Sequence, residues 1–417
     1  MTTSTTPHDP YVALRNTEFR FYLAFRLIIT LAIQIEAVIV GWQVYDLTQD
    51  ALNLGLIGLA EAIPAIGVAL YAGHLADIVN RKAIILTCYT ILLACGVSLW
   101  FFAANMQTLP KDVVLWGVFV TVFFTGIARG FVGPAVFGFL GQIVEKSIYK
   151  NAVTWSSNVW QSASVLGPAI AGFLYAEVGL EKTYIVQSSL VVMAFCCVLM
   201  IAAKPLPPHN RAEPVSSRIK EGLRFVFRNQ LILSALSLDL FAVLFGGAVA
   251  LLPVFAKDIL QVGAEGLGIL RAAPAVGAVS LATILAYKPI GRNAGKILLW
   301  CVAGFGVATV GFALSTNFML SVFFLFLTGA FDSVSVVIRG TLVQTLTPEN
   351  MKGRVSAVNN IFIGSSNEIG AFESGVAARA MGTVPSVVFG GCMTILVVMV
   401  TAFAAKKLLQ LDLNKIE

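Results

Sequence analysis

The sequence predicts an all-α membrane protein of twelve membrane-spanning helices, arranged as two pseudo-symmetric six-helix bundles. Three observations predict this fold class: an apolar composition, apolar stretches of helix length, and a pattern in the first half that recurs in the second. Of the 417 residues, 58% are apolar and 12% are charged, whereas soluble domains are usually about 45–50% apolar and about 25% charged. The composition therefore excludes a soluble globular protein.

The apolar stretches predict helices rather than barrel strands. Stretches such as 113–124 and 298–314 lack the alternation of inward and outward residues that a membrane barrel requires. The segment at 19–46 lacks the short core and cleavage site of a signal peptide, and we expect it to remain as the first helix. Six helices are predicted in each half, at 19–46, 54–79, 83–104, 112–139, 149–177 and 182–203, and at 229–256, 264–287, 295–316, 318–346, 355–380 and 383–407.

A polar stretch at 204–228 separates the two sets of helices. It contains Pro205, Pro207, Pro208 and Pro214, and it predicts a cytoplasmic linker between bundles at 1–203 and 229–417. Its cations alternate with apolar residues towards residue 228. This pattern fits either an amphipathic helix on the membrane surface or an ordinary positively charged inner loop.

The distribution of cations predicts the orientation. With both termini in the cytoplasm, 20 of the 28 Lys and Arg residues fall in or beside inner loops, and only Lys111, Lys182, Lys257 and Arg379 fall in outer loops. Inner loops of membrane proteins carry such an excess. We therefore expect a multi-pass protein of a bacterial inner membrane with cytoplasmic termini.

The two halves repeat one another at an offset of 210 residues. Parallel repeats of this kind occur in transporters, whose substrate site lies at the bilayer midplane between the repeats. The matching positions are Gly58, Pro64, Ala65 and Gly67 with Gly268, Pro274, Ala275 and Gly277, and Arg129-Gly130 with Arg339-Gly340.

Other partners and activities find little support. The net charge of +6 comes from cations scattered over short loops, which argues against nucleic-acid binding. The six cysteines lie in apolar stretches without metal-ligand spacing, and no phosphate-binding loop, HExxH or GxSxG motif occurs. We therefore expect no cofactor, metal or enzymatic activity, and a linker of 25 residues is too short for the signalling domain of a receptor.

The segment 73–82 resembles the signature loop of the major facilitator superfamily. Gly73, Leu75, Asp77, Arg81 and Lys82 match that signature, while Ile78 and Asn80 replace its usual Arg and second Gly. In the family, the Asp and the basic residues lock neighbouring helices in the outward-facing state. The resemblance therefore implies a gating role for Gly73, Asp77 and Arg81, and the alternative is an ordinary inner loop.

The segment 163–172 resembles the antiporter motif of the superfamily's drug/proton exporters. Gly167, Pro168 and Gly172 match, whereas Ala163 and Ala171 replace glycines. Small residues also permit close helix packing by themselves, so a gating role for Gly167 and Pro168 and a purely structural role both remain open. Further stretches, at 41–48, 239–247 with 251–253, and 270–275, resemble the siderophore-exporter and multidrug branch, which includes the enterobactin exporter.

Ten ionisable residues are predicted within helices. A charge at the bilayer centre costs about 2.5–3.5 kcal/mol on insertion scales, so ten charges imply pairing, protonation or a water-filled pathway. Arg129 and Arg339 follow the repeat, which fits bracing of helices four and ten as well as a role in gating, coupling or substrate binding. The ten are Glu36, Glu61, Asp239, Asp332, Glu368 and Glu373 with Arg26, Arg129, Arg271 and Arg339.

Proton coupling would need carboxylates, because the three histidines, His8, His74 and His209, fall in the tail, in the inner signature loop and in the linker. Glu36, Asp239 and Glu368 are the coupling candidates, each with a structural ion pair as its alternative role. Glu61 and Arg271 occupy equivalent positions of the two halves and could pair or flank the substrate. The predicted substrate cavity comprises Glu61, Arg271, Trp42, Asn158, Asn360, Glu373 and Asp332.

The function predicted from these features is secondary transport. We expect a monomer that exports amphipathic small molecules, such as drugs, in exchange for protons by alternating access across the lipid bilayer. Within the transporter class, the alternatives are a siderophore-specific exporter and a lysophospholipid flippase.

Overall fold

The structure, a computed structural model, describes residues 11–205, 215–288, 290–291, 293–348 and 351–413. Every regular element within these ranges is a helix, which confirms the predicted all-α fold class. Within the same residues, ten helical segments are long and apolar enough to cross a membrane. The chain is a multi-pass membrane protein.

The first four long helices match the predicted ones to within a few residues. A short 3₁₀ helix precedes them. Asn80 caps the start of the third long helix, because its side chain accepts hydrogen bonds from the amides of Lys82 and Ala83, as polar residues at helix starts commonly do. The elements are η1 (Val12–Arg15), α1 (Thr17–Thr48), α2 (Ala51–Ile78), α3 (Arg81–Ala104), α4 (Lys111–Ile143) and η2 (Lys146–Ile148).

The next element, α5 (Tyr149–Leu199), consists of two helices that meet at a kink, and they correspond to two of the predicted helices. Its 51 residues would extend about 76 Å as a straight helix, more than twice the thickness of the bilayer core. Gly179 divides it, with a φ of 80° that no other residue type adopts readily. The helical segments on either side of Gly179 are thus each long enough for one membrane span.

The predicted helix at 229–256 is interrupted in the structure. After α7 (Gln230–Phe245) the chain continues through η3 (Ala248–Leu251), α8 (Leu252–Val254) and the π-helical turn η4 (Phe255–Ile259). Five long helices follow, and the short α14 (Lys406–Leu409) comes after them. The five are α9 (Gly263–Tyr287), α10 (Ala294–Leu314), α11 (Phe318–Leu346), α12 (Lys352–Met381) and α13 (Thr383–Ala404). α12 is rich in Ser, Asn and Glu and is not among the ten most apolar helices; its membrane crossing stays a prediction.

The chain folds into two compact units that do not coincide with its sequence halves. Unit 1 comprises residues 1–37, 63–167 and 180–210, and unit 2 comprises 38–62, 168–179 and 211–417. Parts of α1, α2 and α5 therefore pack with the helices of the second half. The predicted bundles at 1–203 and 229–417 are a division by sequence, and they stay a prediction.

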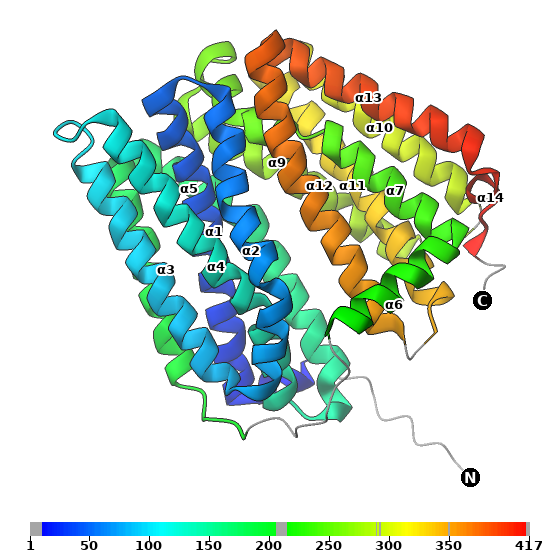
Figure 1. Cartoon of the computed structure of the whole chain (residues 1–417), viewed down its shortest axis with the longest axis horizontal. Coiled ribbons are helices and arrows are strands. Elements are labelled where there is room, and N and C mark those ends of the chain that lie inside the picture. Colours follow the sequence, from blue (N-terminus) through cyan, green and yellow to red (C-terminus); the bar gives the residue numbers. More distant parts are fainter. Residues whose placement is uncertain (1–10, 206–214, 289, 292, 349–350, 414–417) are drawn as a thin grey trace. The chain divides into compact units, whose positions relative to one another are not determined.

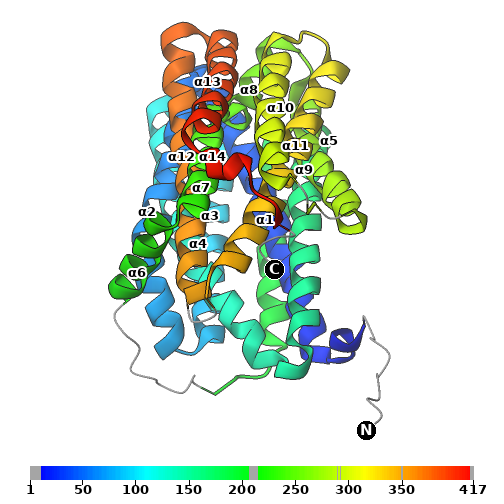
Figure 2. The ribbon, with the colours of Figure 1, turned by 90° about the vertical axis from the view of Figure 1, so that its right-hand side faces the viewer.

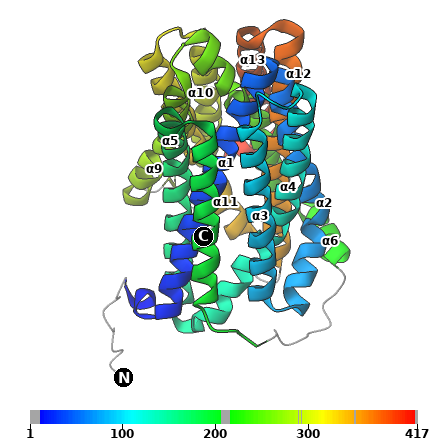
Figure 3. The same cartoon turned by 90° about the vertical axis from the view of Figure 1, so that its left-hand side faces the viewer.

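Each unit has its own apolar core. In unit 1, α3 and α4 lie side by side (Figure 3), and the core contains the fully buried rings of Tyr22, Tyr89 and Phe139. In unit 2, α9 packs along α11 and α10 along α13 (Figure 1). The backbones of α9 and α11 approach so closely that a side chain at Gly277 or Gly329 would overlap the facing backbone.

The end of the predicted linker is a helix, α6 (Val215–Arg228), which lies across the end of α12 (Figures 1 and 2). Val226 is completely buried in the core of unit 2. Glu221 forms an ion pair with Arg354 of α12, and Gly222 allows the backbone of α6 to approach that of Arg354. At least part of the apolar face of α6 is thus covered by protein.

Candidate functional site

A buried ion pair joins two helices of unit 2. The carboxylate of Asp239, on α7, pairs with the guanidinium of Arg339, on α11. Both residues are almost inaccessible, at 6% and 4% exposed. Ser335 precedes Arg339 by one helical turn on the same face of α11, and its hydroxyl donates to Asp239 Oδ1 at 3.5 Å.

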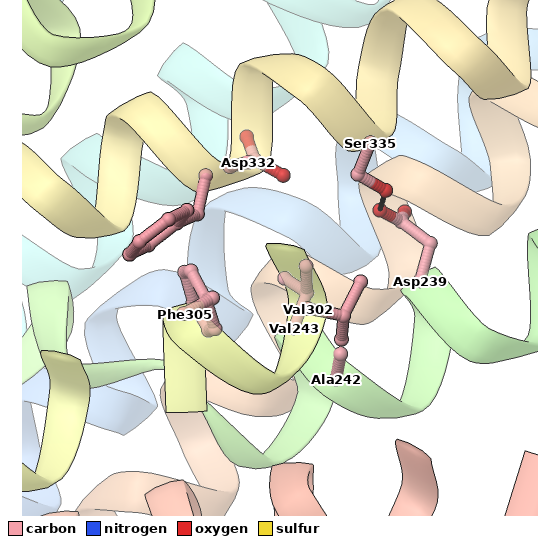
Figure 4. Close-up of a pocket in the computed structure, with 8 residues that line it drawn as sticks. Asp239, Ala242, Val243, Val302, Phe305, Asp332 and Ser335 are labelled. Carbon is pink, nitrogen blue, oxygen red and sulfur yellow. Dashed lines mark hydrogen bonds between the residues drawn. The ribbon is translucent and has the colours of Figure 1, made fainter. Parts of the chain in front are cut away.

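A small cavity adjoins this ion pair. Asp332, three residues before Ser335 on the same face of α11, and Asp239 both line the cavity, from α11 and α7 respectively (Figure 4). Its volume of about 10 Å³ is close to the space that one water molecule occupies. Asp332 forms no hydrogen bond or ion pair with another described residue. The cavity thus holds one paired and one unpaired carboxylate.

Unit 1 contains a second buried carboxylate with a different environment. Both oxygens of Glu36 accept hydrogen bonds, from the Thr125 hydroxyl at 3.1 Å and from the Gln187 amide at 2.7 Å. Arg129 interacts with the same carboxylate electrostatically. Gly96, on α3, leaves the space for Gln187, since a Cβ there would lie 2.7 Å from Gln187 Oε1. Glu36 is 5% exposed and fully satisfied.

The two carboxylates follow the internal repeat only in part. In each half, a carboxylate on the first helix interacts with an arginine on the fourth predicted helix, as Glu36 does with Arg129 and Asp239 with Arg339. The arginines are 210 residues apart, but Asp239 stands seven residues before position 246, the repeat equivalent of Glu36 (36 + 210). Seven residues correspond to about two helical turns, or about 10 Å.

Polar contacts also connect the end of α1 with the π-helical turn η4. The Tyr45 hydroxyl donates to Asp258, and the Lys257 ammonium pairs with Asp46 and lies 5.9 Å from the centre of the Tyr45 ring. Nearby, Arg379 of α12 lies 3.6 Å from Asp50. We call these six residues the latch cluster. Every member belongs to unit 2, and the predicted topology places the cluster at the outer face.

Glycines allow close helix contacts in the same unit. A Cβ at Gly55 of α2 would lie 2.9 Å from the Phe372 Cα of α12. A Cβ at Gly172 of α5 would lie 2.7 Å from the Gly268 Cα of α9. Gly268 belongs to the internal repeat and Gly172 to the segment that resembles the antiporter motif, and both serve here as contact points between helices.

Among the predicted gating residues, Arg81 has a defined position. Its guanidinium donates to the carbonyls of Ala76 and Gly138, each at 2.9 Å, and so connects the turn between α2 and α3 to α4. Gly73 has open space around its Cα, and the side chain of Asp77 lies outside the described part of the structure. A gating role for these residues stays a prediction.

The predicted gating pair Gly167 and Pro168 lies in the middle of α5. Gly167 packs against Gln34 of α1, since a Cβ at Gly167 would overlap that side chain. The Pro168 carbonyl faces Gly268 of α9. Both contacts fit the structural role of small residues in this segment, while a gating role is not tested.

The predicted cavity residues are not brought together at one described site. Arg271 forms no ion pair, and its buried Nε has no hydrogen-bond partner within the described residues, so the considered pairing with Glu61 is not present. Trp42 packs on Tyr175 at 5.8 Å between ring centres. The remaining members differ in burial: Asn158 is exposed, Glu61 and Glu373 are half-buried, and the side chain of Asn360 lies outside the described part. The coupling candidate Glu368 is also half-buried.

The functional contacts that the sequence does not predict come from uncharged or loop residues. Thr125, Gln187 and Ser335 are ordinary helix residues by pattern, and Lys257 counts only as an outer-loop cation. Tyr45 lies in a stretch that resembles the siderophore-exporter branch, which is the only signal that could have singled it out.

A family comparison covers almost the whole chain. The model of the transmembrane secretion effector family, a group within the major facilitator superfamily, matches residues 8–416. The chain belongs to this family. Its members and neighbours are transporters rather than enzymes, in agreement with the resemblance of the loop at 73–82.

Two relatives of this transmembrane secretion effector share about a quarter of its residues. The enterobactin exporter EntS of Shigella boydii is 25% identical over 369 residues, covering 88% of this chain and 87% of the relative. An uncharacterized MFS-type transporter, YfiS of Bacillus subtilis, is 24% identical over 379 residues, covering 87% of each chain.

Solved structures share the fold at lower identity. The D-xylose-proton symporter superposes with a TM-score of 0.70 at 13% identity, covering 93% of this chain and 97% of the other. The nucleoside transporter NupG superposes with a TM-score of 0.71 at 13% identity, covering 93% and 100%. At this identity the likeness establishes the major facilitator fold alone.

Proposed function

We propose that this protein is a proton-coupled exporter of small molecules that works by alternating access. The observation that carries the proposal is the pairing of Asp239 with Arg339 beside the unpaired Asp332 at a water-sized cavity. A charged carboxylate without a partner is costly within membrane-spanning helices, and proton binding removes that charge. Asp332 is the proton-binding group of the proposal, with Asp239 as its neighbour across the cavity.

The ion pair supplies a second state for the same site. A proton on Asp239 would release Arg339, and the guanidinium could then attract the charged form of Asp332, which stands two turns before it on α11. The two carboxylates would thus exchange one proton and one cationic partner. Glu36, held by three partners in unit 1, and Glu368 stay further coupling candidates.

The latch cluster supports alternating access. Its contacts connect the end of α1, and Asp50 just before α2, with η4 and α12. The two sides of these contacts belong to opposite halves of the sequence. A carrier must break such contacts when it opens the face that carries them. Charge-assisted hydrogen bonds are each worth only about 1.5–3 kcal/mol, so a few of them can hold one face closed and still be broken in every cycle.

The substrate is the less defined part of the proposal. We propose export of amphipathic small molecules through the bacterial inner membrane, by a monomer whose termini lie in the cytoplasm. The relatives named as enterobactin exporters support a siderophore-specific exporter as the second candidate. Uptake of enterobactin, an amphipathic dye and a fluorescent lysophospholipid into everted vesicles would separate the three substrate classes.

The coupling assignment is tested by substrate-induced pH change in energised everted vesicles. We expect the substrate-dependent proton flux of Asp332→Asn and of Asp239→Asn to be at least tenfold lower than that of the wild type. The control is Asp112→Asn, which removes an exposed carboxylate in the first turn of α4 and should leave the flux unchanged. Full proton flux in Asp332→Asn with loss in Glu36→Gln would move the coupling site to unit 1.

A further inference from the structure

A hollow lies between the linker helix and the ends of two spans. The last turn of α6, the start of α7 and α14 surround it, on the side of unit 2 where these elements meet (Figure 2). Its volume is about 730 Å³. The residues that line it are Phe225, Arg228, Asn229, Gln230, Leu231 and Lys407.

The charges around the hollow are positive. Arg228 and Lys407 are exposed, and neither forms an ion pair within the described residues. Gln230 is neutral, and the Asn229 side-chain oxygen is occupied, since it accepts from the amides of Leu231 and Ile232 at 3.2 Å.

The neighbouring elements keep this charge positive. Arg224 of α6 and Lys406 of α14 add two exposed cations next to the hollow. The acidic residue of α6, Glu221, is paired with Arg354. The acidic residue beyond α14, Asp412, already has an interaction. The hollow therefore offers two unpaired cations to an anion.

The cations of the hollow lie at the ends of two candidate membrane spans. Arg228 stands two residues before the span Gln230–Ile259, and Lys407 stands three residues after the span Thr383–Ala404. Apolar side chains accompany the cations: Phe225 and Leu231 line the hollow, and Phe227 and Phe403 near it are 60% and 82% exposed. Unpaired cations next to exposed rings at a span end match a lipid, with its charged headgroup and apolar chains.

We propose that this hollow binds the phosphate headgroup of an anionic phospholipid. Arg228 and Lys407 contact the phosphate, the Gln230 amide faces the glycerol, and the acyl chains lie along the exposed phenylalanines. The predicted topology places the site at the cytoplasmic leaflet, where anionic lipids are enriched. The bound lipid attaches the linker helix to the membrane, and this role is independent of the transported substrate and of proton coupling.

Lipid binding to the purified full-length protein tests the proposal. Adducts of phosphatidylglycerol and phosphatidylcholine are measured by native mass spectrometry for the wild type and for Arg228→Gln/Lys407→Gln. We expect the double variant to bind phosphatidylglycerol about 30-fold more weakly, at ~1 kcal/mol for each cation near a surface. Binding of phosphatidylcholine should be equal in both proteins.

Two matched variants separate the site from bulk charge and from misfolding. Lys111→Gln/Lys182→Gln removes two exposed cations of outer loops, gives the same net charge, and should bind phosphatidylglycerol like the wild type. Arg228→Lys/Lys407→Arg keeps both charges and should also retain binding. Equal losses in both Gln pairs, or no preference of the wild type for phosphatidylglycerol, would overturn the proposal.

Inorganic phosphate distinguishes the source of the anion. At millimolar concentration it should not displace phosphatidylglycerol, because it makes no contact with the apolar lining. Full displacement would show that the hollow takes a free phosphate group instead of a lipid, and would overturn the assignment.

Discussion

Tyr45 and Asp258 are 213 residues apart in the sequence, and the hydroxyl of the first donates a hydrogen bond to the carboxylate of the second. The contact joins the end of α1, from the first half, to the π-helical turn η4, from the second. Removing the hydroxyl would leave the ring in place and delete only this hydrogen bond. The latch cluster can therefore be weakened one contact at a time.

The first prediction concerns the strength of the latch cluster. Tyr45→Phe with Asp46→Asn removes one hydrogen bond to a charged group and one ion pair, and we expect the open form of this face to become at least tenfold more populated. The readout is labelling by a membrane-impermeant maleimide of a cysteine at Leu54, in a background without the six native cysteines. Leu54 is 5% exposed and packs in the cluster of Tyr45 and Val254. Unchanged labelling relative to Asp112→Asn would contradict the role of the latch.

A second prediction follows from the Asp239–Arg339 pair. Arg339→Gln leaves a buried carboxylate without its cation, and loss of one partner of a buried pair typically costs about 3–5 kcal/mol. We expect a large drop in the midpoint of thermal unfolding. Asp239→Asn/Arg339→Gln, which removes both charges, should recover most of that loss. If the double variant is as unstable as the single one, the instability of Arg339→Gln does not come from the unpaired charge of Asp239.

The third prediction tests the packing around Glu36. Gly96→Ala places a methyl group where the Gln187 amide and the Ser188 hydroxyl lie, so the hydrogen bond to Glu36 must shift. We expect a loss of stability of about 1–3 kcal/mol, the usual cost of a buried polar group without its partner. Gly133→Ala is the control, because that glycine has open space and the helix gains from the exchange. The measurement is thermal unfolding of both variants in detergent.

The fourth prediction concerns the contact between α5 and α9. Gly268→Leu fills the place where the backbone at Gly172 approaches, so we expect the two helices to separate and transport to fall at least tenfold. The comparison is Gly67→Leu, which should transport normally, because no described residue outside the local helix backbone comes within 4 Å of a Cβ added there. Substrate efflux from vesicles with equal amounts of protein provides the test. Equal activity of the two variants would show that close packing at Gly268 is not needed.

Much of the fold follows from the sequence because a bilayer dictates the length and polarity of each helix. The segment at 318–346 is a predicted helix and is α11 in the structure, and the other boundaries differ by a few residues. The break of the predicted helix at 229–256 does not follow from the sequence. It occurs at Gly246 and Gly247, and glycine is also common in continuous membrane helices. The division of α5 does follow, because the predicted helices at 149–177 and 182–203 lie on either side of Gly179, where the backbone is not helical.

The sites follow from the sequence only as a set of residues. A charge within an apolar stretch is visible, so Glu36, Asp239, Asp332 and Arg339 are all identified without a structure. Their partners are not, because Asp239 and Arg339 are 100 residues apart and nothing local relates them. Neutral partners such as Gln187 carry no signal in an apolar helix, and the pairing of Lys257 with Asp46 depends on a turn that no pattern predicts.

The π-helical turn η4 gives the latch cluster a further property, which concerns the number of residues rather than their identity. A π-helical turn holds one residue more than an α-helical turn, and each residue advances an α-helix by about 100°. Deleting a single residue within Phe255–Ile259 would restore regular α-helical winding. The residues before the deletion would then be rotated about the helix axis relative to the residues after it. The alignment of Lys257 and Asp258 with α1 therefore depends on the extra residue in this turn. Deleting one residue of the turn other than these two would break their contacts with α1, although both side chains would still be present.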